Sequence, residues 1–149
     1  MSSEFDKFQE LIMADMRKVY SEVVIDHMMN PRNMGSLADA DGFGRVIGPC
    51  GDKMEIWLNV KNDAVAETSF ITNGCGTSLA SGSMVTELAK GKSIPEALKI
   101  RQQDVLNALN GLPEESVHCA LLAANTLKEA IKDYIAFKNE PWKRAYHQH

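Results

Sequence analysis

A segment with period-two alternation near the middle of the chain restricts the possible folds most strongly. In MEIWLNV, residues 54–60, every second side chain from Met54 is large and apolar, and Glu55, Trp57 and Asn59 lie between them. Because successive side chains of a β-strand point to opposite faces, this pattern predicts a strand with one buried face and one face that is at least partly exposed. The chain therefore has to build a sheet with one packed side.

The residues on either side of this strand predict a small antiparallel sheet. Asn62 and Asp63 supply turn chemistry, and the AVAETSFIT segment that follows, residues 64–72, is rich in β-branched and aromatic side chains. A segment around residues 45–47 can form a third strand. We therefore predict a three-stranded antiparallel meander.

Helical patterns flank the predicted sheet. From Phe5, apolar residues recur at steps of three and four and predict one helix to about Met28, followed by a loop over residues 30–44. After the predicted sheet, one helix begins at Cys75, and a second begins at the capping box formed by Ser93 and Glu96. A third, short helix is capped by Asp104 and ended by Gly111, and a final helix runs from about Pro113 to Phe137.

These elements predict an α+β fold in which a three-stranded antiparallel sheet packs with about five to six helices. The 149 residues suit a single domain over residues 1–149. Residues 1–19 form an N-terminal helical extension that we expect to pack on the domain, with a dimer or a partner contact as the alternative. Residues 140–149 read as a loose tail.

Composition and charge exclude several classes of protein. No stretch approaches the ~18 consecutive apolar residues needed to span a membrane, and a net charge of -4 argues against non-specific nucleic-acid binding. The opening MSSEFDKFQE is typical of neither a secretion signal nor a mitochondrial transit peptide. We expect a cytoplasmic protein that binds neither membranes nor nucleic acids.

The three cysteines each lie in a context that favours exposure or ionisation. Cys50 lies in the loop GPCGD, Cys75 is flanked by glycines at a helix start, and Cys119 follows His118 near another helix start. Helix N-termini and a neighbouring imidazolium lower thiol pKa values. Three thiols and one imidazole, with the carboxylate of Asp52 close by, suit zinc or an iron–sulfur cluster.

Each of these residues also has a simpler interpretation when it is taken alone. A lone cysteine is more often a small buried apolar residue than a ligand. Asp52 by default bonds local backbone in a turn, and His118 by default lies on a helix flank. His27 beside Asp26 is expected to have a surface or capping role. Only the combination of the three cysteines favours a metal or cluster site.

The combination of PCGD, GCG and HC resembles the IscU family of iron–sulfur cluster assembly scaffolds, which also occurs as the N-terminal domain of NifU. The segments YSEVVIDHMMNPRNMGSL, NGCGTSLASGSMVTELAKGKSIPEA and HCALLAANTLKEAIKDY are similar to family segments, so the resemblance covers residues 20–134. It implies a three-stranded antiparallel sheet packed with helices, which agrees with the pattern analysis.

The resemblance implies roles for individual residues. Cys50, Cys75 and Cys119 become cluster ligands and sulfur acceptors, with Cys119 or Cys50 as the exposed acceptor, and Asp52 or His118 becomes the changeable fourth ligand. Asp52 is associated with keeping the cluster labile, which is reasonable because a carboxylate holds iron less tenaciously than a thiolate does.

The resemblance further implies a scaffold rather than a turnover enzyme, carrying a transient [2Fe–2S] cluster built from iron and sulfur. A pyridoxal-phosphate cysteine desulfurase of the IscS/NifS type would deliver persulfide sulfur. Iron and electrons would come from separate donors, and apo iron–sulfur proteins would accept the cluster. A homodimer that shares a cluster is an open alternative.

The chain departs from the family pattern in three places. Gly48 and Pro49 run directly into Cys50, where many scaffolds have Gly-x-Pro-x before the cysteine. The Leu-Pro-Pro-Val-Lys segment that docks a DnaK-like chaperone reads Leu112-Pro113-Glu114-Glu115-Ser116, so we predict weak or no binding to that chaperone. The third departure is the extension before Tyr20.

Two zinc alternatives use the same ligands. One is a zinc-bound sulfur acceptor that stimulates a desulfurase, as in the SufU branch, although the step from Cys75 to Cys119 lacks the insertion typical of that branch. The other is a structural zinc protein with tetrahedral coordination by the three cysteines and Asp52 or His118.

Overall fold

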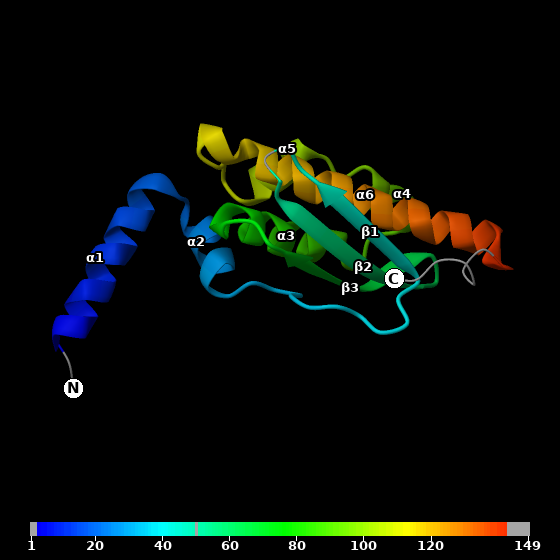
Figure 1. Ribbon diagram of the computed structural model, residues 1–149, viewed down its shortest axis with the longest axis horizontal. Helices are drawn as coiled ribbons and strands as arrows, with labels where there is room; N and C mark the ends of the chain where they lie inside the picture. Colours follow the sequence, from blue (N-terminus) through cyan, green and yellow to red (C-terminus); the bar gives the residue numbers. More distant parts are fainter. Residues whose placement is uncertain (1–2, 50, 143–149) are drawn as a thin grey trace.

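The three predicted strands form one antiparallel sheet in the order β1-β2-β3 (Figure 1). In the computed structural model, which describes residues 3–49 and 51–142, the strands are β1 (Gly42–Ile47), β2 (Lys53–Lys61) and β3 (Ala64–Thr72). Ile56 at the centre of β2 pairs with Gly44 on one side and with Phe70 on the other. The predicted meander is confirmed.

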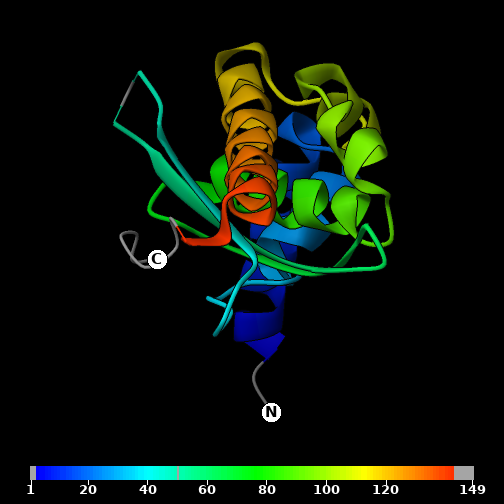
Figure 2. The same cartoon turned by 90° about the vertical axis from the view of Figure 1, so that its right-hand side faces the viewer.

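Helices cover one face of this sheet (Figure 2). The helices on this face are α2 (Glu22–Met29), α3 (Gly76–Ala89), α4 (Ile94–Leu98), α5 (Gln102–Ala108) and α6 (Val117–Asn139), with a 3₁₀ turn η1 (Glu114–Ser116) before α6. A further helix, α1 (Ser3–Val19), precedes them in the chain. α6 packs across β1 and β2, and α3 packs against β3 and α6. Within the described ranges, no helix has the length and apolar character needed to cross a membrane.

Two glycines let β1 lie directly against α6. A Cβ atom on Gly44 would lie 2.5 Å from the backbone nitrogen of Ala130, and one on Gly42 would lie 2.5 Å from the Ala130 carbonyl oxygen. Real side chains do not approach backbone atoms so closely. Glycine is therefore required at both positions for strand and helix to pack at this distance.

The buried side of β2 is formed as the alternation predicts. Met54, Ile56 and Leu58 are fully buried and pack with Phe70 of β3 in the core. Trp57, on the other face, is also buried, with its ring centroid 5.2 Å from that of Phe43. The expectation of an exposed second face is therefore wrong at Trp57, because Phe43 from the neighbouring strand covers it.

The single first helix of the prediction is in fact two helices. Ser21 interrupts it, because its side chain accepts a hydrogen bond from the Val24 amide and thereby caps α2, while its hydroxyl donates to the Leu109 carbonyl. α2 packs on α3, whereas α1 projects away from the rest of the protein and contains no buried residue (Figure 1). The N-terminal extension was expected to pack on the domain, but α1 meets it chiefly at α2 and buries none of its own residues.

The later helices form where the sequence predicts them, but two of them begin at other residues than expected. Ser93 and Glu96 form the predicted capping box, but Asp104 lies in the first turn of α5 and accepts from the Arg101 amide. α6 begins at Val117 rather than near Pro113, because the intervening residues form η1. The predicted loose tail lies largely outside the described residues, as do His147 and His149.

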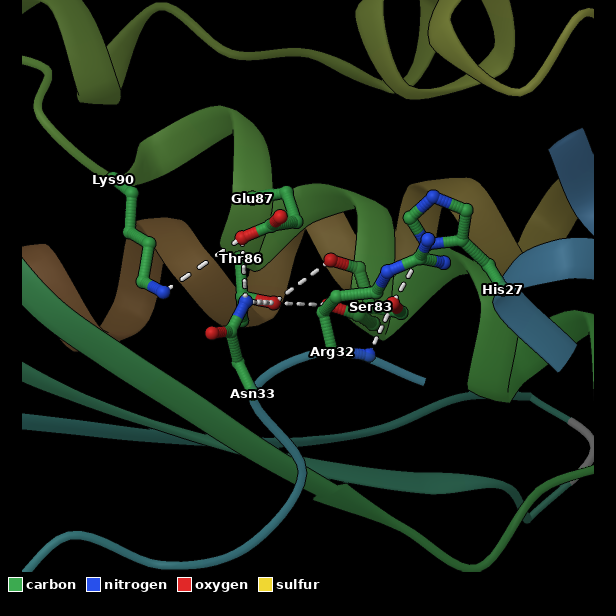
Figure 3. A network of polar contacts seen from close by, with 8 residues as sticks. His27, Arg32, Asn33, Ser83, Thr86, Glu87 and Lys90 are labelled. Atoms are coloured by element: carbon green, nitrogen blue, oxygen red, sulfur yellow. Dashed lines mark hydrogen bonds and ion pairs between the residues drawn. The ribbon is translucent and has the colours of Figure 1, made fainter. Parts of the chain in front are cut away.

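A polar network fastens the loop after α2 to α3 (Figure 3). His27 is buried rather than at the surface, with its Nδ1 2.7 Å from Ser83 Oγ, and the Arg32 amide donates to the same oxygen at 2.8 Å. The Asn33 amide group donates to Thr86 Oγ1 at 3.0 Å. The expected surface or capping role of His27 is therefore wrong, because its ring faces Ser83 of α3.

The burial of His27 leads to a prediction about pH. Burial lowers the pKa of His27 below its ordinary 6.5, and the nearby Arg32 charge acts in the same direction, against Asp26 and Glu87. Below about pH 6.5 the unfolded chain takes up a proton that the folded chain resists, so the free energy of unfolding should decrease as the pH falls.

Chemical denaturation of the metal-free protein between pH 7.5 and 5.5 tests this. We expect His27→Gln to lose less stability than the wild type over this interval, whatever its stability at pH 7.5. Equal losses in the two proteins would contradict the assignment.

Candidate metal and cluster site

Three segments that are distant in sequence meet at one end of the sheet. They are the β1–β2 loop with Asp52, the start of α3 with Cys75, and the start of α6 with His118 and Cys119. Cys50 belongs to the same loop as Asp52 but lies outside the described residues. The structure thus brings together the described members of the predicted set.

The β1–β2 loop is held by its own backbone. The Gly48 amide donates to the Asp52 carbonyl at 2.7 Å, and the Gly51 amide donates back to the Gly48 carbonyl at 3.0 Å. Gly51 has a φ of 87°, a conformation that favours glycine. The Lys53 amide donates to Asn73 Oδ1 at 2.7 Å, which ties the loop to the segment before Cys75.

Three potential ligands are close enough to bind one ion. A carboxylate oxygen of Asp52, a ring nitrogen of His118 and the Cys119 sulfur all lie within 4.8 Å of one another. His118 Nε2 is 3.8 Å from Cys119 Sγ. Cys75 joins this group through Thr77, whose hydroxyl oxygen is 3.0 Å from Cys75 Sγ and 3.3 Å from Cys119 Sγ.

Two hydroxyl groups that the sequence analysis did not single out connect these ligands. Ser78 Oγ lies 3.3 Å from Asp52 Oδ2 and 3.3 Å from Cys119 Sγ, and Thr77 bridges the two cysteines. Both side chains are buried. Each hydroxyl has one proton to donate, so it can serve only one anionic neighbour at a time. Their position directly after GCG was the only available sequence signal.

The two described thiols differ in ionisation. Burial raises the pKa of the Cys75 thiol, but the Thr77 hydroxyl and the polar groups at the start of α3 lower it by more, so the net pKa lies below its ordinary value. For Cys119, burial raises the pKa and outweighs the hydroxyls of Ser78 and Thr77. Cys75 is therefore the more readily ionised thiol of the two.

The two thiols also differ in exposure, and the thiol with the lower pKa is the more exposed one. Cys75 is exposed, whereas Cys119 is only 1% exposed because it faces α3 from the first turn of α6. The expectation of an exposed Cys119 is therefore wrong.

A cavity of about 240 Å³ opens beside Asp52 and His118, and the exposed side chains of Ile47 and Leu121 contribute to its wall.

The chemistry of the donor set fits iron or zinc. Thiolate and imidazole are the ligands that these ions prefer, and a carboxylate adds a harder and more easily displaced donor. Asp52, His118 and Cys119 could hold one metal ion, and Cys75 lies one hydroxyl group away from them. The buried Thr77 and Ser78 hydroxyls supply hydrogen bonds to the ligands.

Comparison with known proteins gives consistent matches. The family model for the NifU-like N terminal domain matches residues 19–141. The iron-sulfur cluster assembly scaffold protein IscU 1 of Archaeoglobus fulgidus is 50% identical over 117 residues, which cover 78% of this chain and 76% of the relative. The IscU scaffold protein of Escherichia coli K12 is 46% identical over 120 residues, covering 77% of this chain and 93% of the relative.

Solved structures share the fold. The N-terminal part of a NifU-like protein from Brucella abortus aligns with a TM-score of 0.64 at 18% identity, covering 81% of this chain and 97% of that one. A candidate scaffold protein for the SUF system from Fervidobacterium islandicum aligns with a TM-score of 0.63 at 22% identity, covering 77% and 98%. At these identities the likeness concerns the fold alone.

The role of Thr77 can be tested by thiol reactivity. Thr77→Val keeps the shape of the side chain but removes the hydroxyl, so the pKa of Cys75 should rise and less thiolate should be present at pH 7. We expect alkylation of Cys75 by iodoacetamide, followed by peptide mass spectrometry, to slow by about threefold to tenfold.

Ser81→Ala is the matched control, because the buried Ser81 hydroxyl on the same helix donates to the Thr77 carbonyl and to neither sulfur. It should leave the rate at Cys75 unchanged. A Thr77→Val protein that reacts at the wild-type rate would show that the hydroxyl does not favour the thiolate.

Proposed function

Because this chain belongs to the NifU-like N-terminal domain family, we propose that it is a scaffold on which an iron–sulfur cluster is assembled and from which the cluster is passed to other proteins. Relatives at 46% to 50% identity carry the name of such scaffolds. The observation that supports the proposal most is the meeting of Asp52, His118 and Cys119 within 4.8 Å, with Cys75 one hydroxyl away.

The proposed ligands are the three cysteines and one changeable partner. Cys75 and Cys119 would bind through their sulfurs, Cys50 would complete the thiolate set from the β1–β2 loop, and Asp52 or His118 would occupy the fourth position. Asp52 is the stronger candidate for reversible binding, because its carboxylate is a harder donor than a thiolate and Ser78 can hold it when it leaves the metal.

The cluster is the cargo of this site rather than a resident cofactor. A cysteine desulfurase would deliver two sulfur atoms, each as a persulfide on a cysteine of the scaffold. Their reduction to two sulfides takes four electrons, of which two ferrous ions would supply two as they become ferric and an electron donor would supply the other two. Two iron ions from an iron donor and two sulfides would then form a [2Fe–2S] unit. If sulfur is delivered to Cys119, its surroundings must open, since only 1% of its surface is exposed.

Transfer would proceed by ligand exchange with an apo iron–sulfur protein. Asp52, half-buried on a loop, can be displaced without disturbing the core. We infer weak or no binding to a DnaK-like chaperone, because Glu114 and Glu115 in η1 are exposed acids at positions where the family segment has proline and valine.

Anaerobic reconstitution tests the proposal. Protein freed of metal and supplied with ferrous iron, a cysteine desulfurase, cysteine and a reductant should turn brown and show thiolate-to-iron absorption bands, with about two irons and two sulfides per cluster. Cys119→Ser should greatly reduce the cluster content, and Glu67→Ala, which removes an exposed carboxylate from β3, should leave it unchanged.

A colourless protein that retains one zinc per chain and cannot be reconstituted would contradict the scaffold and favour a zinc protein. Zinc in an aerobic preparation would not decide between the two, because zinc readily fills a vacant thiolate site.

A further inference from the structure

The N-terminal helix α1 lies outside the family domain and carries an exposed apolar stripe. The family match begins at residue 19, and α1 ends at Val19. Apolar side chains recur along one side of the helix at steps of three and four: Phe5, Phe8, Ile12, Met16 and Val19. Four of the five are between 45% and 60% exposed, and Met16 is half-buried. The scaffold function does not account for this surface.

An isolated helix of this size has little stability of its own. The 17 residues of α1 are close to the length at which even favourable helices are marginal in water, so most helices depend on the burial of an apolar face. α1 meets the rest of the chain chiefly at α2, through contacts that include an Arg17 to Glu22 ion pair at 2.8 Å. The stripe therefore needs a partner for the helix to persist.

The spacing of the stripe is symmetrical about Ile12. The steps from Phe5 to Val19 are three, four, four and three residues, so they read the same in both directions. When two copies of α1 lie antiparallel with Ile12 at a twofold axis, Phe5 faces Val19 of the second copy and Phe8 faces its Met16. Every apolar residue of the stripe then meets another apolar residue.

The charges of α1 select the same arrangement. The first turn contains Glu4 and Asp6, and the last turn contains Arg17 and Lys18. Antiparallel copies place the acids of each helix beside the bases of the other, whereas parallel copies place like charges together. This pattern favours a second copy of the chain over an unrelated helix, because the apolar stripe matches itself when reversed and the two ends of the helix carry opposite charges.

We propose that the chain forms a homodimer through antiparallel pairing of α1 with α1 of a second copy. The contact is isologous and closed, as expected for a twofold dimer. The helix is about 25 Å long, and each α/β body is attached at the C-terminal end of its own α1. The two bodies therefore lie at opposite ends of the helix pair, and each keeps its own metal and cluster site. The pair is a small interface, so the dimer should dissociate on dilution.

Sedimentation velocity over a concentration series, on metal-free protein with chelator and reductant, tests the proposal independently of any cluster chemistry. We expect a reversible dimer in the wild type. Ile12→Glu places two carboxylates at the twofold axis and should weaken dimerisation at least about tenfold. Ala14→Glu adds the same group on the opposite side of the helix and should have no effect, and circular dichroism checks that both variants remain folded.

Charge reversal tests the orientation. A protein with Glu4→Lys and Asp6→Lys, and another with Arg17→Glu and Lys18→Glu, should each dimerise more weakly than the wild type. An equimolar mixture of the two should recover dimerisation, because both ends of the mixed pair become complementary. A monomeric wild type, a dimer that survives Ile12→Glu, or a mixture no tighter than its components would overturn the proposal.

Discussion

The close contact between β1 and α6 brings Asp52 to the start of α6, where His118 and Cys119 lie. Gly42 and Gly44 allow the strand to rest on the backbone of the helix around Ala130, and farther along β1 the loop residue Gly48 reaches Leu122 near the helix start. Strand and helix thus run antiparallel. The β1–β2 loop with Asp52 consequently meets the first turn of α6, where Cys119 lies.

The site gathers groups that repel one another once they are ionised. Burial, together with the charges of Cys75 and Asp52, raises the pKa of Cys119. Without a cation, the raised pKa favours a protonated Cys119, with the Thr77 and Ser78 hydroxyls as its nearest hydrogen-bonding partners. A metal held by Cys119 and Asp52 would offset this repulsion and displace the thiol proton, so metal binding would be coupled to pH. We propose that such a site binds a cation reversibly, because the competing proton and the Ser78 hydroxyl can each take the place of the metal at a ligand.

The sheet and most helices could be predicted because their signals are local. The alternation around Ile56 indicates a strand whatever surrounds it, and Ser93 caps α4 with neighbouring residues. Ser21 was missed because a serine within an apolar helical pattern does not show that its hydroxyl will reach Leu109, far along the chain. Thr77 and Ser78 were missed for the same reason, since their roles exist only once the start of α3 packs against Asp52 and Cys119. The burial of Cys119 likewise depends on packing between α3 and α6.

The central claim is that Asp52 makes an otherwise stable thiolate site reversible. The most direct measurement is the rate at which a reconstituted [2Fe–2S] cluster passes to an apo ferredoxin, followed anaerobically by circular dichroism for the wild type, Asp52→Ala and the Glu67→Ala control. If the account is correct, Asp52→Ala keeps its cluster markedly longer than the other two proteins. Transfer or loss from Asp52→Ala that is as fast as from the wild type, or faster, would contradict it.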